Sequence, residues 1–345
     1  MLDPGGRMRA SSSGCEQSRR ESTAGHDGSS EGAGMSFRGH GISRVAVLGA
    51  LLVVGALSVG VVSGQQGQME VEVEQLQDNL YVLRGGGGNS AAFVTSDGVV
   101  LVDTKVAGWG QPLIDTIGEL TSNPVTTIIN THAHFDHVSG NVEFPASVEF
   151  VAHENAKTLM EEWNPVTGFP GDFPDVFDTS GGQGLPTRTY EDRLTLGSGD
   201  DQVDLYYFGR GHTGGDTWVV FPALRTMHAG DMFPGKQVPI MDASNGGSGL
   251  EYANTLRMAY STVTEIDTII TGHSVQMDRD DLREMADFVD GLVSAAKQAK
   301  ARGVSAADFV ASWSPKPRFR TDFSVPGGAS FQAWVQVIYD EIDAM

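Results

Sequence analysis

The chain has 345 residues, of which 40% are hydrophobic, so it is long and apolar enough for one large α/β domain with appendages. Its net charge of −21 repels phosphate backbones and anionic membranes, which argues against nucleic acid or a membrane surface as a partner and favours a small-molecule substrate. The single cysteine, Cys15, excludes a disulfide framework, an iron–sulfur cluster and a structural cysteine-zinc site.

The first 64 residues differ in composition from the rest of the chain. Residues 1–34 are rich in Ser, Gly, Glu and Arg without hydrophobic periodicity, which indicates a disordered leader or a wrongly assigned start. Residues 35–64 have the pattern of a signal peptide, because Arg38 and Arg44 precede the uncharged apolar run 45–62 and small residues follow. We therefore expect a periplasmic or secreted protein. An apolar run of this length also fits an uncleaved membrane anchor, with the protein facing outside the cytoplasm.

A catalytic domain is expected over residues 68–300, followed by a C-terminal helical extension, residues 301–345, that packs on it. Residues 111–120 have the apolar periodicity of a helix. Strands are predicted in this first half at 70–76, 80–83, 91–96, 99–103 and 125–130. The four glycines from Gly85 to Gly88 predict a flexible turn rather than a phosphate-binding loop, because neither Gly-Lys-Ser/Thr nor a helix follows.

The second half of the domain begins with a long segment, residues 163–189, rich in Pro, Gly, Phe and Asp. Segments of this kind are functional or disordered. Strands are then predicted at 194–196, 203–208, 217–221, 226–229 and 267–270. Helices are predicted at 280–300, where acidic residues come early and lysines late as the helix dipole favours, and at 304–313 and 331–342.

Three histidines and an aspartate fall within six residues, in the stretch Thr131-His132-Ala133-His134-Phe135-Asp136-His137. Neutral imidazole nitrogens and a carboxylate oxygen suit borderline cations, zinc above all. The stretch follows the apolar strand 125–129, and in a loop at the carboxyl end of a strand the side chains at i and i+2 can point together. The spacing predicts a metal site rather than a solvated polar loop.

Three further candidate ligands each follow a predicted strand. His212 follows 203–208, Asp231 follows 226–229 and His273 follows 267–270, each with glycine close by. Open α/β sheets bind ligands outside the carboxyl ends of their strands, and glycine permits the tight turns needed there. The shared placement predicts that these residues converge with the stretch 132–137.

Taken together, these motifs resemble the metallo-β-lactamase superfamily. The stretch 132–137 is similar to the main metal motif of that family, and Gly211-His212-Thr213, Gly230-Asp231 and Gly272-His273 follow in the family order. The strand end Leu101-Val102-Asp103-Thr104 resembles the first motif, whose aspartate supports the site without binding metal. The resemblance covers roughly residues 70–275. It implies the α/β fold class, as a four-layer αβ/βα sandwich with C-terminal helices and the metals at one edge.

The resemblance also implies a ligand set of seven residues for two Zn²⁺ ions. One zinc is expected on His132, His134 and His212, and the other on Asp136, His137 and His273, with Asp231 bridging both. Asp103 and Thr213 are expected behind these ligands, and Asp136 is expected to orient the attacking hydroxide or shuttle its proton. The same set of donors also accepts iron or manganese.

The function implied is that of a dinuclear zinc hydrolase, in which a metal-bridging hydroxide cleaves an ester, thioester, lactone or amide bond. With an aspartate at position 231 the chain resembles the glyoxalase II-like, lactonase and general hydrolase branch of the family. Many β-lactamases of the family carry Cys or Ser at this position. Three alternatives stay open: a β-lactamase-type antibiotic hydrolase, a mononuclear iron sulfur dioxygenase on the same fold, and a non-catalytic metal-binding protein.

The remaining histidines, His153 and His228, are interpreted as structural or supporting groups rather than ligands. The long segment contains four aromatic residues that predict either an apolar substrate wall or a loop that packs on itself: Trp163, Phe169, Phe173 and Phe177.

Overall fold

The computed structural model describes residues 69–171 and 173–345. The predicted leader, residues 1–34, and the predicted signal segment, residues 35–64, lie outside the described residues. Within the described ranges, no helix combines the length and the apolar character needed to cross a membrane.

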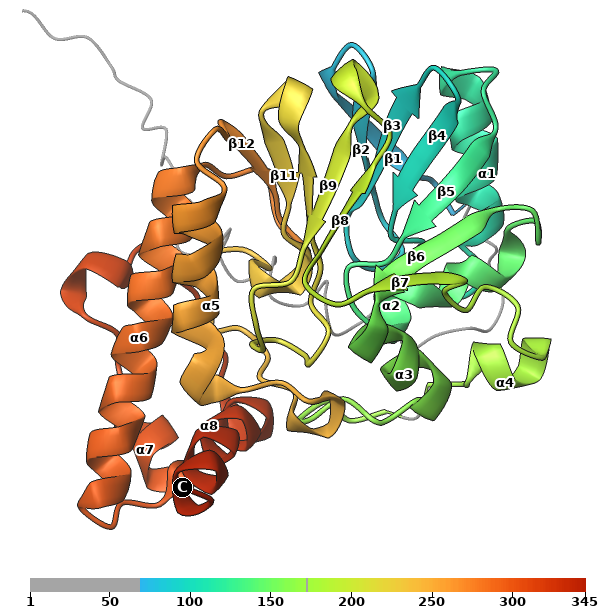
Figure 1. Cartoon of the computed structure of the whole chain (residues 1–345). Helices are drawn as coiled ribbons and strands as arrows, with labels where there is room; N and C mark the ends of the chain where they lie inside the picture. Colours follow the sequence, from blue (N-terminus) through green and yellow to red (C-terminus); the bar gives the residue numbers. More distant parts are fainter. Residues whose placement is uncertain (1–68, 172) are drawn as a thin grey trace, which may run out of the picture. The chain divides into compact units, whose positions relative to one another are not determined.

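Two β-sheets form the centre of the domain (Figure 1). The first has seven strands in chain order: β1 (Glu72–Gln77), β2 (Leu80–Arg84), β3 (Ser90–Thr95), β4 (Gly98–Val102), β5 (Val125–Ile129), β6 (Glu149–His153) and β7 (Arg188–Tyr190). The second has the order β12-β11-β10-β9-β8: β8 (Arg193–Leu196), β9 (Val203–Tyr206), β10 (Trp218–Phe221), β11 (Thr226–His228) and β12 (Thr268–Ile270). Strands β4 to β7 run parallel, as do β11 and β12, so both sheets are mixed.

Helices flank the two sheets, some on the outer faces and others packed on neighbouring helices. They are α1 (Gly110–Leu120), α2 (Phe135–Val138), α3 (Glu154–Glu162), α4 (Val176–Ser180), α5 (Gly249–Thr262), α6 (Arg279–Ala301), α7 (Ala306–Ser312) and α8 (Gly328–Asp343). In Figure 1, α1 lies against the first sheet, whereas α5 and α6 lie against the second. This arrangement confirms the expected α/β class and the αβ/βα sandwich with C-terminal helices.

Alternation of side chains along the strands builds the layers. Val100 and Val102 of β4 pack between the two sheets. Val99 and Leu101 point to the opposite face and pack against α1. Strand β10 repeats the pattern, with Val219 and Phe221 between the sheets and Trp218 and Val220 against α5 and α6. Successive side chains on a strand face opposite sides, so one apolar run supplies two cores.

The C-terminal helices share one core with the second sheet. Phe309 of α7 and Phe331 and Trp334 of α8 belong to the same buried cluster as Phe288 of α6. The helices α4 and α5 were not among the expected elements. Each begins at a polar cap, Asp175 for α4 and Ser248 for α5, but α4 is too short for a periodic apolar face.

Candidate metal centre

The buried carboxylate of Asp103 shapes the loop that carries the first histidines. Asp103 directly follows β4 and has a positive φ of 60°, which is uncommon for a residue with a side chain. It accepts hydrogen bonds from the backbone N–H and the hydroxyl of Thr131, at 2.8 and 2.6 Å. The same carboxylate lies 2.7 Å from Nδ1 of His137. Asp103 therefore holds the loop 131–137 and turns Nε2 of His137 away from itself.

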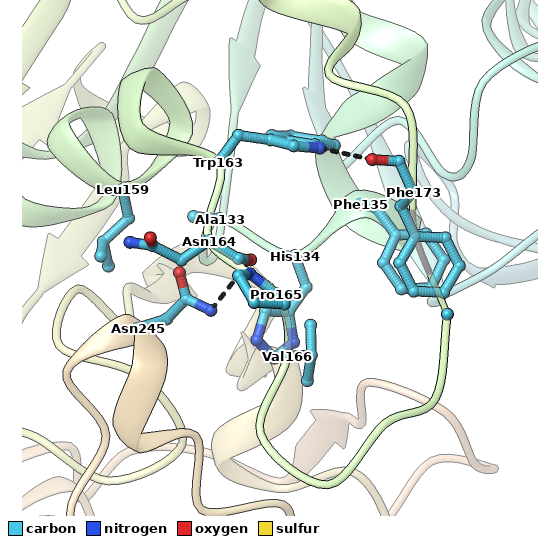
Figure 2. A pocket seen from close by; sticks show the side chains of 11 residues that line it. Ala133, His134, Phe135, Leu159, Trp163, Asn164, Pro165, Val166, Phe173 and Asn245 are labelled. Atoms are coloured by element: carbon cyan, nitrogen blue, oxygen red, sulfur yellow. Dashed lines mark hydrogen bonds between the residues drawn. The ribbon is translucent and has the colours of Figure 1, made fainter.

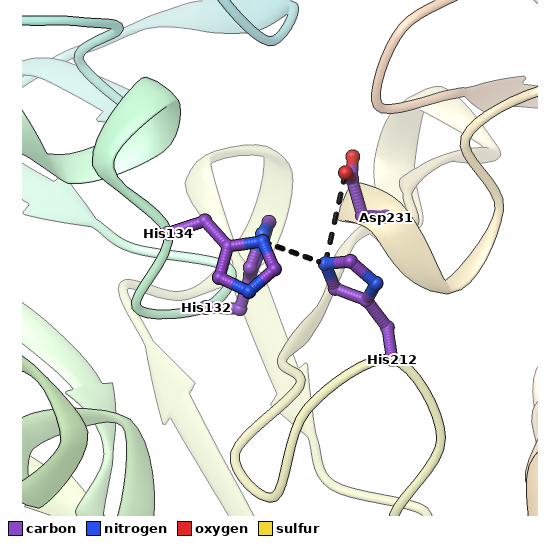
Figure 3. A group of neighbouring side chains, drawn as sticks. All are labelled: His132, His134, His212 and Asp231. Atoms are coloured by element: carbon purple, nitrogen blue, oxygen red, sulfur yellow. Dashed lines mark hydrogen bonds and ion pairs between the residues drawn. The ribbon is translucent and has the colours of Figure 1, made fainter. Parts of the chain in front are cut away.

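A first group of four ligand atoms converges from both sheets: His132, His134, His212 and Asp231 (Figure 3). One atom of each lies within 4.8 Å of the others. Nδ1 of His134 is 3.0 Å from Nε2 of His212, which is 3.7 Å from an oxygen of Asp231. All four residues are buried.

The outer nitrogen of each ring in this group has its own partner. Nδ1 of His132 meets the Thr131 hydroxyl at 3.0 Å, and Nδ1 of His212 meets the Ile240 carbonyl at 3.1 Å. Nε2 of His134 meets the carboxylate of Asp242 at 2.8 Å. Such contacts fix the tautomer and the ring orientation of metal-ligating histidines, so each ring presents its other nitrogen to the centre.

A second group, Asp136, His137 and His273, lies beside the first. Nε2 of His273 is 3.3 Å from Nε2 of His137 and 3.3 Å from Asp136. The carboxylate of Asp231 reaches this group too, at 3.4 Å from His137 and 3.2 Å from His273. Asp231 thus stands between the two groups, where its two oxygens can serve both.

Two polar atoms of the centre lack hydrogen-bond partners, which fits a site that binds a cation. Nε2 of His132 and Oδ1 of Asp231 are buried without any hydrogen-bond partner. A buried polar atom left in this way costs free energy unless something binds it. Burial also lowers the pKa of His132 well below its usual value and that of His212 to about 4, so both rings are neutral and able to bind a metal.

Negative charge dominates the second group. Burial disfavours a charged His137, but the adjacent carboxylates Asp136, Asp231 and Asp103 outweigh burial and raise its pKa well above the usual range. Burial also opposes ionisation of Asp231, yet its histidine neighbours, His273 first, keep the pKa of that carboxyl low. A site that draws protons onto a buried imidazole in this way is one that favours positive charge.

The four-glycine turn packs directly against the second group. A Cβ on Gly88 would overlap the ring of His137, and one on Gly87 would press on the backbone oxygen of Asp136. The N–H of Gly88 donates to that same oxygen at 3.0 Å. The chain bends at these glycines, as predicted for a turn, and at Gly87 and Gly88 the close contact with two candidate ligands leaves no room for a side chain.

Sequence reasoning missed two buried charged residues that support the centre. Asp242 holds His134, as described above, and lies in a stretch without a recognisable motif. Lys105 is fully buried with a φ of 70°, and its ammonium donates to the carbonyls of Leu83 and Gly88 at 2.8 Å each. Burial lowers its pKa to about 7. A lysine directly after the Asp-Thr strand end was the available signal for it.

The other predicted residues lie at the edge of the site or away from it. Thr213 binds the buried carboxylate of Asp216 through its N–H and hydroxyl, one residue from His212. His153 accepts the N–H of Asn155 at the start of α3 and meets the carbonyl of Glu191. His228 accepts the N–H of Gly230 and faces the Asn89 carbonyl. Neither histidine belongs to the two candidate ligand groups.

Of the four aromatic residues predicted in the long segment, two line a pocket and two do not. Trp163 and Phe173 line a pocket that also touches His134 (Figure 2). Phe177 is buried and packs edge-on against Trp163 behind the pocket. Phe169 is 40% exposed and does not line it.

Two mixed sheets flanked by helices, with a His/Asp cluster that could hold metal ions, define an α/β protein with a candidate metal centre. The sequence of residues 83–294 matches the family model of the metallo-beta-lactamase superfamily, and the chain belongs to this family. It is 27% identical to a metallo-beta-lactamase type 2 from Elizabethkingia meningoseptica over 173 residues, which is 47% of this chain and 61% of that relative.

Two more similarities extend over more of the chain. It is 24% identical to the 2,4-dinitroanisole O-demethylase subunit alpha from Nocardioides sp. (strain JS1661), over 72% of each chain. The solved structure of the stereoselective inverting sec-alkylsulfatase Pisa1 from Pseudomonas sp. aligns with a TM-score of 0.61 and 13% identity, covering 79% of this chain and 50% of that one. The structural likeness shows the fold.

Proposed function

We propose that this chain is a two-metal hydrolase that cleaves an ester, thioester, lactone or amide bond of a small molecule, with zinc as its metal. The observation that carries the proposal is the position of Asp231, whose carboxylate reaches both groups of candidate ligands. One group would hold one ion through His132, His134 and His212, and the other would hold the second through Asp136, His137 and His273. When bound, such a metal pair lowers the pKa of water and polarises a carbonyl oxygen.

The open side of the centre lies at the second group. The side chains of His273 and Asp136 are 33% and 18% exposed, whereas those of His134, His137, His212 and Asp231 are 6% exposed or less. Water and the substrate, with the bond to be cleaved, would approach the two groups of ligands from this side. Asp136 then takes the role of orienting water and accepting its proton, because a general base must lie within hydrogen-bond reach of the proton it abstracts.

Buried supports would keep the ligands in place during turnover. Asp103 fixes His137, and Asp242 fixes His134. Preorganised ligands of this kind need little rearrangement when charge develops in the transition state. The two carboxylates are thus positioning residues in the proposal, and neither touches the substrate.

The cellular setting is part of the proposal. The pattern of residues 35–64 supports export to the periplasm or the medium, with a membrane anchor as the alternative. The net charge of −21 supports a small-molecule substrate over nucleic acid.

A metal-dependence experiment tests the proposal. The purified chain is assayed on p-nitrophenyl esters, lactones, a thioester and a chromogenic β-lactam, before and after chelation and after return of zinc. We expect hydrolysis of at least one ester, thioester or lactone that disappears with chelation and returns with zinc. Hydrolysis of the β-lactam alone would move the assignment to the antibiotic hydrolases, and oxygen uptake with iron would move it to the dioxygenases.

A further inference from the structure

The pocket beside His134 lies between the metal loop and the segment that follows α3 (Figure 2). We infer that this pocket binds an uncharged apolar group of the substrate, about the size of a phenyl ring, beside the bond that is cleaved. The inference rests on the proposed hydrolase function and names its substrate class: neutral carboxylic esters, lactones or amides that carry such a ring.

The volume of the pocket sets the size of the group. It measures about 150 Å³. An apolar protein cavity of about 150 Å³ is known to accept benzene. A methyl group would leave most of this space unfilled.

The side chains that line the pocket determine which kind of group it can bind. They are mainly aromatic and aliphatic, with two amides and His134 as the polar members: Ala133, Phe135, Leu159, Trp163, Asn164, Pro165, Val166, Phe173 and Asn245. Among the described residues that line the pocket there is no lysine or arginine. Because burying an anion without a partner costs several kcal/mol, on the order of magnitude given for isolated charges, the lining favours a neutral group over an anionic one.

The pocket is held in shape before any ligand arrives. The indole N–H of Trp163 donates to the carbonyl of Phe173 at 2.8 Å. The ring of Phe173 stacks on Phe135 with centroids 3.4 Å apart. A preformed wall of this kind reduces the ordering cost of binding.

A single carboxylate fixes the pocket segment relative to the metal loop. One oxygen of Asp242 accepts the N–H of Thr167 at 2.9 Å, and the other lies 2.8 Å from Nε2 of His134. The carbonyl of Thr167 in turn accepts the indole N–H of Trp334 on α8, at 3.0 Å. Because the pocket segment and His134 share Asp242, the pocket has a fixed position relative to the first group of candidate ligands.

A pair of filling variants tests the assignment. Leu159→Phe adds bulk to the lining from α3, whereas Thr158→Phe adds the same bulk at an exposed position of the same helix and serves as the matched control. Hydrolysis of methyl phenylacetate, methyl acetate and methyl 4-carboxyphenylacetate is followed by acid release in a pH-stat. In hydrolysis the water oxygen bonds to the acyl carbon, the acyl–oxygen bond breaks, and methanol and a carboxylic acid form.

We expect kcat/KM for methyl phenylacetate to exceed that for the other two esters by about tenfold or more, which is the range that a filled apolar pocket contributes. Leu159→Phe should lower this value about tenfold and leave methyl acetate within about twofold. Thr158→Phe should change neither. If Leu159→Phe fails to fold by circular dichroism, Val166→Phe fills the pocket from another part of its lining and replaces it.

A binding measurement separates this inference from the proposed function. The full chain is titrated against fluorobenzene and 4-fluorobenzoate and followed by ¹⁹F NMR. Fluorobenzene should bind, 4-fluorobenzoate should not, and Leu159→Phe should abolish the binding. If no substrate is hydrolysed but this binding pattern holds, the hydrolase proposal fails and the pocket assignment stands. If esters are hydrolysed with no preference for the ring, or fluorobenzene binds Leu159→Phe as well as the wild type, the pocket assignment is overturned and the hydrolase stands.

Discussion

Asp103 acts on two residues with one carboxylate. Its oxygens accept the N–H and hydroxyl of Thr131 and hold Nδ1 of His137, while its own backbone adopts a positive φ. Nothing in this arrangement requires Asp103 to touch a metal. Its contribution is to orient the candidate ligand His137, and ligands that are oriented by such a hydrogen bond bind metal more tightly.

Replacing Asp103 with Asn should therefore weaken metal binding without unfolding the chain. Asparagine tolerates a positive φ and keeps the shape of the side chain, but it loses the charge that faces His137. We expect the affinity for the ion held by the second group, which contains His137, to fall by about 10- to 100-fold, measured by competition with a chromophoric chelator. Asp97→Asn, at an exposed turn, is the control. An unchanged affinity in Asp103→Asn would remove Asp103 from its supporting role.

Among elements, the four-glycine turn between β2 and β3 shows how backbone can support a metal centre. It passes so close to Asp136 and His137 that side chains are excluded at Gly87 and Gly88. Lys105 holds the turn in place by donating to the carbonyl of Leu83, before the turn, and to that of Gly88, its last residue. The turn therefore belongs to the scaffold of the second ligand group.

The substitution Gly88→Ala tests this close contact. The added methyl group would overlap His137, so we expect loss of the metal bound by the second group and a lower melting temperature. Gly118→Ala is the matched control, because Gly118 lies in α1 with open space around its Cβ position. Alanine is favoured over glycine inside a helix by about 0.5–1 kcal/mol, so Gly118→Ala should retain metal and be slightly more stable. Equal behaviour of the two variants, by elemental analysis and calorimetry, would contradict the role given to the turn.

At the scale of the whole molecule, the buried histidines link stability to pH. Burial lowers the pKa of His212 and His228 to about 4, whereas unfolded imidazoles titrate near 6.5. Between these values the unfolded chain binds more protons than the folded chain, so stability falls as the pH falls from 6.5 towards 4. His137 and His273, whose pKa values are raised, gain stability as the pH falls through 6.5 and oppose the trend there, but burial lowers the pKa of three histidines, His132 being the third.

The metal-free protein should accordingly melt at a lower temperature at pH 5 than at pH 7. Calorimetry of chelator-treated samples in the two buffers measures this difference. A melting temperature that is equal or higher at pH 5 would show that the burial of these histidines does not govern the pH response.

The sequence predicted most of the fold because apolar alternation and strand-end motifs are local signals. The stretch 132–137 carries three histidines in one loop, so its ligands could be recognised without any structure. Asp242 could not be found in this way, because it meets His134 from 108 positions away and only folding brings the two together. Helix α5 was not predicted, because it follows a glycine-rich stretch and has no strong periodic apolar face of its own. The close packing of the glycine turn likewise depends on contacts between distant segments.

The most direct measurement of the central claim is the number of metal ions bound per chain, in the wild type and in Asp231→Ala. The carboxylate of Asp231 reaches both ligand groups and supplies negative charge between them. Without it, two divalent ions would repel one another and lose a shared ligand. Elemental analysis after dialysis should find about two zinc ions per wild-type chain and one or fewer in Asp231→Ala, with an unchanged far-UV circular dichroism spectrum. One equivalent of iron in an active wild-type sample, or two zinc ions retained by Asp231→Ala, would contradict the account.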